Sequence, residues 1–187
     1  MAAVPPLRIL HCFRSPVGGI FRHVRDLAEE HAKAGHEVGI LCDSSTGGAY
    51  EDQLFETIMP HLSLGLTRMP IRRSLGPSDI SAAFRTYNEI KQLQPDILHG
   101  HGAKGGAFVR LVGSRLRVSR SRVARLYSPH GGSLHYDRNT LRGRTYFAIE
   151  RMLERWTDSL VFVSDYERCT YTDKIGAPKA PWQLIHN

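Results

Sequence analysis

The chain has 187 residues, of which 41% are hydrophobic, and this is enough to build one ordinary buried core. Its formal net charge is +7, which taken alone suggests a polyanionic partner such as nucleic acid or an anionic membrane. No stretch approaches the ~20 apolar residues that span a bilayer, and the N-terminus lacks the pattern of a signal peptide. We therefore expect neither secretion nor membrane spanning.

The cysteines favour a reduced compartment. Cys12, Cys42 and Cys169 are odd in number, form no C-x-x-C pair and lie within or beside apolar runs. Disulfide frameworks need paired cysteines and an oxidising environment. The sequence therefore predicts a cytoplasmic location.

Short β-branched or leucine-rich runs alternate with amphipathic stretches along the chain. This order predicts an α/β fold, with a doubly wound, mostly parallel, Rossmann-like sheet in a single domain. The expected strands are Leu7–Phe13, Glu37–Cys42, Leu62–Met69, Asp96–His99, Arg122–Tyr127 and Ser159–Val163, with a last apolar run at Trp182–Ile185. The expected helices are Ile20–Ala34, Asp79–Leu93 and Leu141–Trp156, and the expected loops are Asp43–Tyr50 and Arg72–Ser78.

The first candidate motif joins the first strand to the first helix as Ser15–Ile20, with the sequence SPVGGI. Gly18 and Gly19 let the backbone approach a ligand, and a helix start offers unpaired N–H groups and a partial positive charge that suit a phosphate. A tight turn without a ligand is the alternative interpretation. The motif is not G-x-G-x-x-G, which disfavours a dinucleotide site, although Asp43 after the second strand could imitate the ribose-binding acid.

The second motif is an H-x-H strand end, His99-Gly100-His101, which runs into a glycine-flanked helix start. Residues two apart on a strand face the same way, so the two imidazoles could share a metal. A third ligand would be needed, and no Cys, Asp or His cluster lies close in sequence. Polar histidines that line a cleft, or that are satisfied at the sheet edge, are the favoured interpretation.

The third motif, Tyr127–Gly132, again follows a strand and ends in two glycines. His130 is held on this turn rather than on an apolar face, which favours a functional role over a buried structural one. Further along, Glu150–Arg168 has a helix-then-strand pattern, and Ser164 is a plausible N-cap for a following helix.

A basic segment lies between Asp96 and Asp137, where there is no acidic residue. Its cations equal the whole net charge in number and are Lys104, Arg110, Arg115, Arg117, Arg120, Arg122 and Arg125. A solvated helix face and a functional patch are both open interpretations. One hypothesis is a peripheral contact of Arg110–Arg125 with the anionic inner leaflet of a membrane.

Taken in order, these motifs resemble the N-terminal domain of GT-B glycosyltransferases, specifically the retaining family 4 enzymes. The glycine loop, the H-x-H strand end, the histidine-glycine turn and the segment Glu150–Arg168 each have a counterpart there, and Ile185–Asn187 looks like the start of the crossing into a second domain. The resemblance implies that residues 1–187 form the acceptor-side half of a GT-B fold and that the donor-binding domain is absent from this chain. The isolated half would be inactive.

The resemblance also implies a reaction and site residues. The activity would be transfer of a sugar from a nucleotide sugar, with retention, to a sugar or lipid-linked acceptor, as in cell-envelope polysaccharide biosynthesis. Gly18 and Gly19 would approach the donor diphosphate, and His130 would be catalytic, touching the transferred sugar or the leaving phosphate. The same cleft would be lined by His99, His101, Lys104 and Gly131. No metal and no other cofactor would be required.

Two other function classes stay open at this stage. A dinucleotide-dependent oxidoreductase would need the fingerprint glycines and would bind NAD by itself. A nucleic-acid-binding module could use the basic segment, but no recognised readout motif and little aromatic interleaving occur between Ala103 and Leu126, so nucleic acid is not the expected partner.

Overall fold

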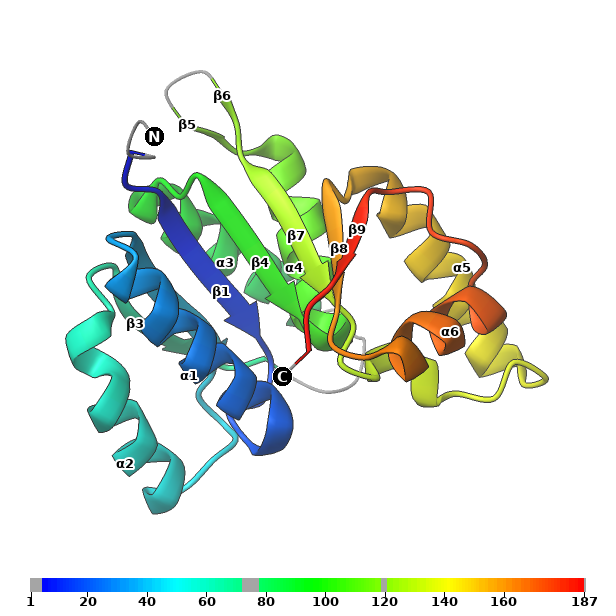
Figure 1. The fold of residues 1–187 in the computed structure, drawn as a ribbon, viewed down its shortest axis with the longest axis horizontal. Helices are drawn as coiled ribbons and strands as arrows, with labels where there is room; N and C mark the ends of the chain where they lie inside the picture. Colours follow the sequence, from blue (N-terminus) through cyan, green and yellow to red (C-terminus); the bar gives the residue numbers. More distant parts are fainter. Residues whose placement is uncertain (1–4, 72–77, 119–120, 187) are drawn as a thin grey trace.

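The computed structural model describes residues 5–71, 78–118 and 121–186. Its centre is a seven-stranded sheet in which every pairing is parallel, in the order β3-β2-β1-β4-β7-β8-β9 (Figure 1). The strands are β1 Arg8–Phe13, β2 Glu37–Asp43, β3 Gly65–Met69, β4 Ile97–His101, β7 Ala124–Ser128, β8 Ser159–Phe162 and β9 Trp182–Leu184. The predicted doubly wound α/β fold is confirmed.

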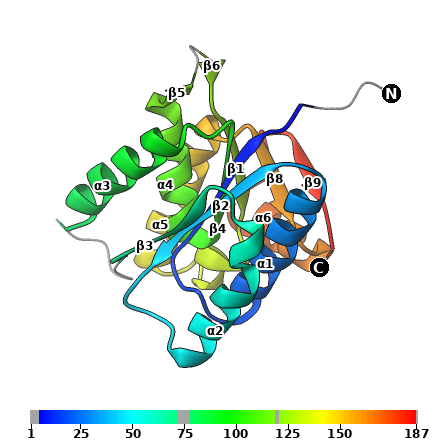
Figure 2. The same ribbon diagram turned by 90° about the vertical axis from the view of Figure 1, so that its left-hand side faces the viewer.

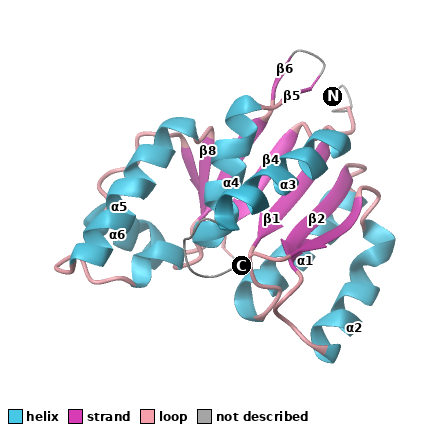
Figure 3. Ribbon diagram, turned by 180° about the vertical axis from the view of Figure 1, so that it is seen from behind, coloured by secondary structure: helices cyan, strands magenta, loops and turns pink. Residues whose placement is uncertain are grey.

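Helices cover both faces of this sheet, as Figure 2 shows. One face carries α1 Gly18–Lys33 and α2 Ala49–Ile58. The other carries α3 Ser78–Leu93, α4 Gly102–Arg115 and α5 Leu141–Leu153, and α3 and α4 cross in front of the strands when the molecule is seen from behind (Figure 3). Helix α6 Asp165–Lys174 packs on this second face as well, since its Tyr171 lies in one core cluster with Phe162 and Tyr127. Three short 3-10 turns, η1 Met59–His61, η2 Gly132–His135 and η3 Glu154–Trp156, join these elements.

The strands are apolar because they are buried on both faces, as is usual for parallel sheets. In β1, Leu10 and Cys12 pack into the core under α3 and α4, while Phe13 packs with Phe21 of α1 on the opposite face. Since side chains alternate along a strand, His11 shares its face with Phe13. His11 therefore points toward α1.

Helix α4 lies against the middle of the sheet because its glycines allow a close approach. A Cβ atom at Gly105 would lie 2.2 Å from the Cys12 carbonyl oxygen, and one at Gly106 would lie 2.2 Å from Cε2 of Tyr127. No real side chain fits at such distances. The glycines after the H-x-H motif therefore serve helix-to-sheet packing.

Several expected boundaries were wrong. Helix α2 was not predicted, and its start overlaps the expected loop Asp43–Tyr50. Strand β3 begins at Gly65 rather than Leu62, because a 3-10 turn and its cap occupy the preceding residues. The expected strand Arg122–Tyr127 is divided, since a small hairpin of β5 Arg117–Val118 and β6 Ser121–Arg122 precedes β7. The expected loop Arg72–Ser78 lies, up to residue 77, outside the described residues.

The order of the strands reverses between β1 and β4, since β2 and β3 extend to one side and β7, β8 and β9 to the other. Ligands of open α/β sheets bind beyond the carboxyl ends of the strands at such a switch point. The site is therefore expected where β1 leads to α1 and where β4 and β7 end. Among the described helices, none is both long and apolar enough to cross a bilayer.

Candidate functional site

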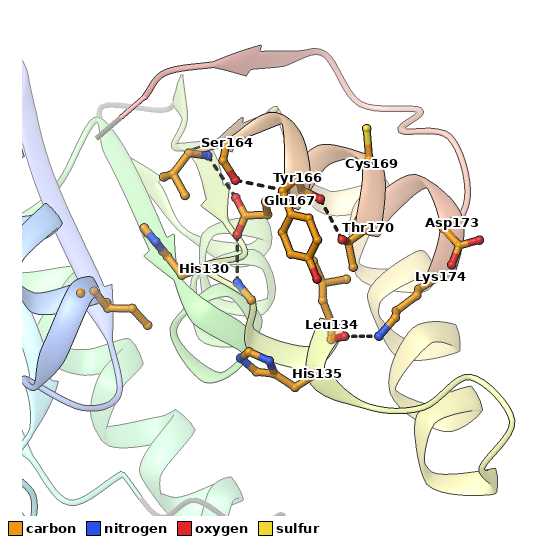
Figure 4. A pocket seen from close by; sticks show the side chains of 14 residues that line it. His130, Leu134, His135, Ser164, Tyr166, Glu167, Cys169, Thr170, Asp173 and Lys174 are labelled. Atoms are coloured by element: carbon orange, nitrogen blue, oxygen red, sulfur yellow. Dashed lines mark hydrogen bonds between the residues drawn. The ribbon is translucent and has the colours of Figure 1, made fainter.

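An open cleft of about 910 Å³ lies at the carboxyl end of the sheet. Its walls come from the start of α1, the turn after β7, the 3-10 turn η2 and one side of α6 along its length (Figure 4). Gly19, His130 and Gly131 line it together, although they are far apart in the sequence. The structure thus joins the first and third motifs in one site.

The start of α1 offers backbone N–H groups to this cleft. No side chain caps the helix, and Gly18 has a φ of +65°, a conformation that glycine adopts without strain. A Cβ atom at Gly18 or Gly19 would meet nothing within 4 Å, so the backbone faces open space. Uncapped N–H groups at a helix start favour an anion.

The turn that carries His130 is held by Glu167 of α6. His130 and Gly131 have φ values of 49° and 72°, in the left-handed region that costs energy for any residue with a side chain. One carboxylate oxygen of Glu167 accepts a hydrogen bond from the Gly131 amide at 2.9 Å, and the other accepts from Val163 N at 3.0 Å. Glu167 therefore fixes the strained turn to α6.

Glu167 was missed by the sequence analysis. Burial raises the pKa of its carboxyl group, against the opposing effect of the backbone hydrogen bonds that it accepts. The available signal was its position three residues after Ser164, which caps α6 by accepting from Glu167 N at 3.1 Å. The predicted N-cap role of Ser164 is confirmed.

Beneath the cleft lies a cluster of histidines on the α1 face of the sheet. The imidazoles of His99 and His101 are adjacent, with ring centroids 4.0 Å apart, as their spacing predicts. His11 of β1 is in register with His99, and its Nδ1 lies 3.0 Å from Nε2 of His101. Nδ1 of His101 in turn lies 3.0 Å from Nε2 of His130.

These imidazoles are neutral because they are buried. Burial, together with the nearby His23, lowers the pKa of His130 to about 3. Burial likewise lowers the pKa of His11 to about 3, with added effects from His31 and His23, and it holds the pKa of His99 and His101 well below the usual value. A neutral imidazole has one donor and one acceptor nitrogen.

The third imidazole that a shared metal would need comes from β1, far away in sequence. His11, His99 and His101 place one ligand nitrogen each within 4.8 Å of one another, and so do His23, His101 and His130. In both triplets, two of the rings are already at hydrogen-bonding distance from each other. A cation bound by either triplet would have to displace one of these ring-to-ring contacts.

The structure does not place His99, His101 and Lys104 on the wall of this cleft, where the sequence predicted them. His99 and His101 are 5% and 1% exposed and lie under the cleft, where Nε2 of His99 is 2.9 Å from Ser128 Oγ. Lys104 lies in the first turn of α4, half-buried, and is not among the residues that line the cleft. Of the four side chains predicted for the site, which are His99, His101, Lys104 and His130, His130 is the one that lines this cleft.

The basic segment is not a continuous solvated patch. Arg110 is fully buried and pairs with Glu150 at 2.8 Å, while Arg125 is 5% exposed and pairs with Asp158 at 2.9 Å. The β5–β6 hairpin lies at the end of the sheet opposite to the cleft (Figure 1). The hypothesis of a membrane contact through Arg110–Arg125 is therefore wrong for two of its arginines.

Asp43 is not available to a ribose. Its carboxylate is buried at the end of β2 and accepts hydrogen bonds from Ile71 N at 2.7 Å and from Thr46 Oγ1 at 2.8 Å. Burial alone would raise its pKa, but these bonds and those from Ser45 outweigh it and lower the pKa. The residue organises its own loop, which argues against the dinucleotide interpretation.

Comparison with known sequences agrees with this geometry. Residues 17–187 match the sequence model of Glycosyltransferase Family 4. The chain is 26% identical over 155 residues to the Bacillus subtilis (strain 168) protein named "Putative glycosyltransferase EpsD", covering 81% of this chain and 36% of that protein. It is 22% identical over 182 residues to an uncharacterized 41.2 kDa protein in the cps region of Klebsiella pneumoniae, covering 97% and 46%. The chain thus spans less than half the length of these relatives.

Solved structures share the fold. A glycosyltransferase from Rickettsia africae ESF-5 aligns with a TM-score of 0.69 at 16% identity, over 98% of this chain and 44% of that one. Alr3699/HepE of Anabaena, solved in complex with UDP and glucose, aligns with a TM-score of 0.66 at 13% identity, over 97% and 44%. The predicted likeness to one half of a GT-B fold is confirmed.

Proposed function

Because the chain belongs to Glycosyltransferase Family 4, we propose that it forms the N-terminal, acceptor-side domain of a sugar-transferring enzyme. The donor-binding domain would lie outside residues 1–187. The likeness to less than half of each relative supports this division. One wall of the catalytic cleft is then supplied by the second domain, and the isolated chain is inactive because water is not excluded from the reacting atoms.

The proposed reaction moves a sugar from a nucleotide sugar to an acceptor hydroxyl, with retention at the anomeric carbon. The bond from the anomeric carbon to the donor phosphate oxygen breaks, the acceptor oxygen bonds to the same face, and the hydroxyl proton passes to the departing phosphate. No protein nucleophile, metal or other cofactor takes part. The physical requirement is stabilisation of the negative charge on the leaving group.

The residues of the cleft suit these roles. The open backbone at Gly18 and Gly19 would meet the donor diphosphate, aided by the partial positive charge at the start of α1. His130, on the opposing wall, would donate a hydrogen bond to the sugar or to the leaving phosphate. The observation that carries the proposal is this pairing of an uncapped helix start with His130 across one cleft.

The proposed acceptor is a sugar or a lipid-linked sugar. The location of a relative in a cps region is consistent with a sugar or lipid-linked acceptor in cell-envelope polysaccharide synthesis. The three free thiols are consistent with a cytoplasmic location. The proposal includes no membrane contact through Arg110–Arg125, since Arg110 and Arg125 are held in buried ion pairs.

Replacement of His130 tests the function. In the full-length protein, His130→Ala should lower kcat about 100-fold, on the order of 3 kcal/mol, because one charge-stabilising donor is removed. KM for the nucleotide sugar should change little if the bond strengthens as charge develops. The measurement is steady-state kinetics with a panel of nucleotide sugars, with residues 1–187 alone as the inactive control.

Two outcomes would contradict the proposal. If His130 only completes the turn, the variant should have a lower Tm while the folded fraction keeps its kcat. Turnover of a nucleotide sugar by residues 1–187 alone would overturn the division into two halves.

A further inference from the structure

Four imidazoles form one continuous chain from the surface of α1 to the cleft. Nδ1 of His31 lies 3.3 Å from Nε2 of His11, Nδ1 of His11 lies 3.0 Å from Nε2 of His101, and Nδ1 of His101 lies 3.0 Å from Nε2 of His130. The members come from α1, β1, β4 and the turn after β7. This row of imidazoles therefore ends at His130, the catalytic residue of the proposed function.

Every link in this chain has the same sense, from Nδ1 of one ring to Nε2 of the next. A neutral imidazole has one N–H and one lone pair, and a hydrogen bond needs one of each. If one ring carries its proton on Nδ1, the next ring must accept at Nε2 and so carry its own proton on Nδ1. All four rings therefore share one tautomer, either Nδ1–H throughout or Nε2–H throughout.

A mixed set of tautomers is costly at this position. It would place two N–H groups or two lone pairs face to face at one link, in a region where His11 and His101 are 0% and 1% exposed. A buried polar group without a partner costs about 1–3 kcal/mol. A charged ring is also disfavoured, because His11, His23, His99 and His130 surround His101 with rings rather than carboxylates.

We propose that His11 and His101 are positioning residues that hold the proton of His130 on Nδ1, so that this ring is a neutral hydrogen-bond donor toward the cleft. The inference rests on the proposed function, in which His130 meets an oxygen that gains negative charge. Nε2 of His130 is used by His101, so Nδ1 is the nitrogen left for a ligand. Only the Nδ1–H form of the whole chain makes that nitrogen a donor.

The tautomers are measurable without any activity assay. Long-range ¹H–¹⁵N correlation spectra of residues 1–187 labelled at histidine report which nitrogen of each ring carries hydrogen. At pH 7.5 we expect Nδ1–H in His11, His31, His101 and His130. A mixed pattern, or a shared Nε2–H pattern, would overturn the proposal.

Two variants of His11 separate positioning from packing. His11→Asn keeps an amide N–H near the position of Nδ1 and should leave His101 and His130 as Nδ1–H. His11→Leu removes the donor and should release both rings into a mixture of tautomers. His186→Ala, which changes an exposed histidine that does not belong to the row of linked imidazoles, is the matched control. Unchanged tautomers of His101 and His130 in a folded His11→Leu protein would overturn the proposal.

Kinetics on the full-length protein distinguish this proposal from the proposed function. His11→Leu should lower kcat at least fivefold with donor KM within twofold, and His11→Asn should recover most of the loss. If His130→Ala leaves kcat unchanged, the proposed function fails while the shared tautomer can still stand. A separate NMR titration tests for a metal site. If equimolar Zn²⁺ shifts the ring ¹⁵N signals of His11, His99 and His101 together, the cluster binds a metal and the proposal of a shared tautomer is wrong.

Discussion

Two buried polar networks lie on opposite faces of the sheet, and they satisfy their polar groups in different ways. Strand β7 contributes to both, since Ser128 contacts His99 on the α1 face and Tyr127 packs against α4 on the other. The first network consists of neutral imidazoles. The second contains the ion pair of Arg110 and Glu150.

The ionic network joins four elements through one carboxylate. Glu150 of α5 accepts from Arg110 of α4 at 2.8 Å, from the Tyr127 hydroxyl at 3.1 Å and from Ser133 Oγ of η2 at 3.1 Å. The guanidinium also lies over the Tyr127 ring, 3.9 Å from its centroid. Each charge has a fixed role, because a carboxylate only accepts and a guanidinium only donates.

In the imidazole network, the direction of hydrogen-bond donation depends on which tautomer the linked rings share. A neutral imidazole can donate from either nitrogen, so the tautomer of one ring sets the tautomers of all the rings linked to it. The buried ion pair therefore fixes the positions of the elements that it joins. The buried neutral histidines instead link the tautomer of His130 at the cleft to the tautomers of the rings behind it. The following experiments act on one network and leave the other intact.

Breaking the ion pair should have the largest effect. Glu150→Ala leaves the Arg110 charge buried and unpaired, which should cost about 3–5 kcal/mol of unfolding free energy. Denaturant unfolding of residues 1–187 measures this. Asp173→Ala, which removes an exposed partner of Arg138, is the control and should cost less than about 1 kcal/mol. Equal losses in the two variants would contradict the assigned role of the buried pair.

Acid should act on the imidazole network. His11 and His130 have folded pKa values of about 3, below the usual 6.5, so the stability that they contribute is complete above pH 6.5 and is lost progressively as pH falls toward 3. At pH 5.5 the loss should be about 1.4 kcal/mol for each group, or about 3 kcal/mol for His11 and His130 together. His99 and His101, whose pKa values are also lowered by burial, should add to the loss in the same direction. Urea unfolding at pH 7.5 and 5.5 measures the difference.

The matched variant is His11→Asn, which should lose about 1.4 kcal/mol less than the wild type over the same pH range because one titrating ring is gone. His186→Ala should behave like the wild type. An unfolding free energy that does not change between pH 7.5 and 5.5 would show that the cluster is already protonated or is open to water.

Removal of a single hydroxyl group from either network should have the smallest effect on the unfolding free energy. Tyr127→Phe removes a bond to the charged Glu150 and should cost about 2 kcal/mol, whereas Ser128→Ala removes a bond to the neutral His99 and should cost about 1 kcal/mol. The two residues are adjacent on β7, which makes them a matched pair. A larger loss for Ser128→Ala would reverse the ranking of the two networks.

The sheet was predictable because buried parallel strands leave apolar runs that can be read locally. Helix α2 was missed because it buries only Phe55 and Ile58 and follows a glycine-rich loop, so its periodic signal is short. The start of β3 was misplaced for a similar reason. The cap of the 3-10 turn η1 is the apolar residue Leu62, which was counted as part of the strand.

The site was predictable only in part. The side-by-side histidines of the H-x-H motif follow from strand geometry, but the contact with His11 depends on the register of β1 against β4. No local pattern sets that register. Arg110 was assigned to a basic segment because its partner Glu150 lies 40 residues away, beyond the reach of any local pattern.

Strand β1 is made before β2 and β4 but lies between them in the finished sheet. The Arg8 amide finds its partner in the Asp96 carboxylate, 88 residues later. At 5–20 residues per second on the ribosome, one edge of β1 stays open for roughly 4 to 18 seconds. Parallel pairing over such a separation is slow to form. During synthesis, the edge of β1 that β4 later covers is therefore open to pairing with other chains.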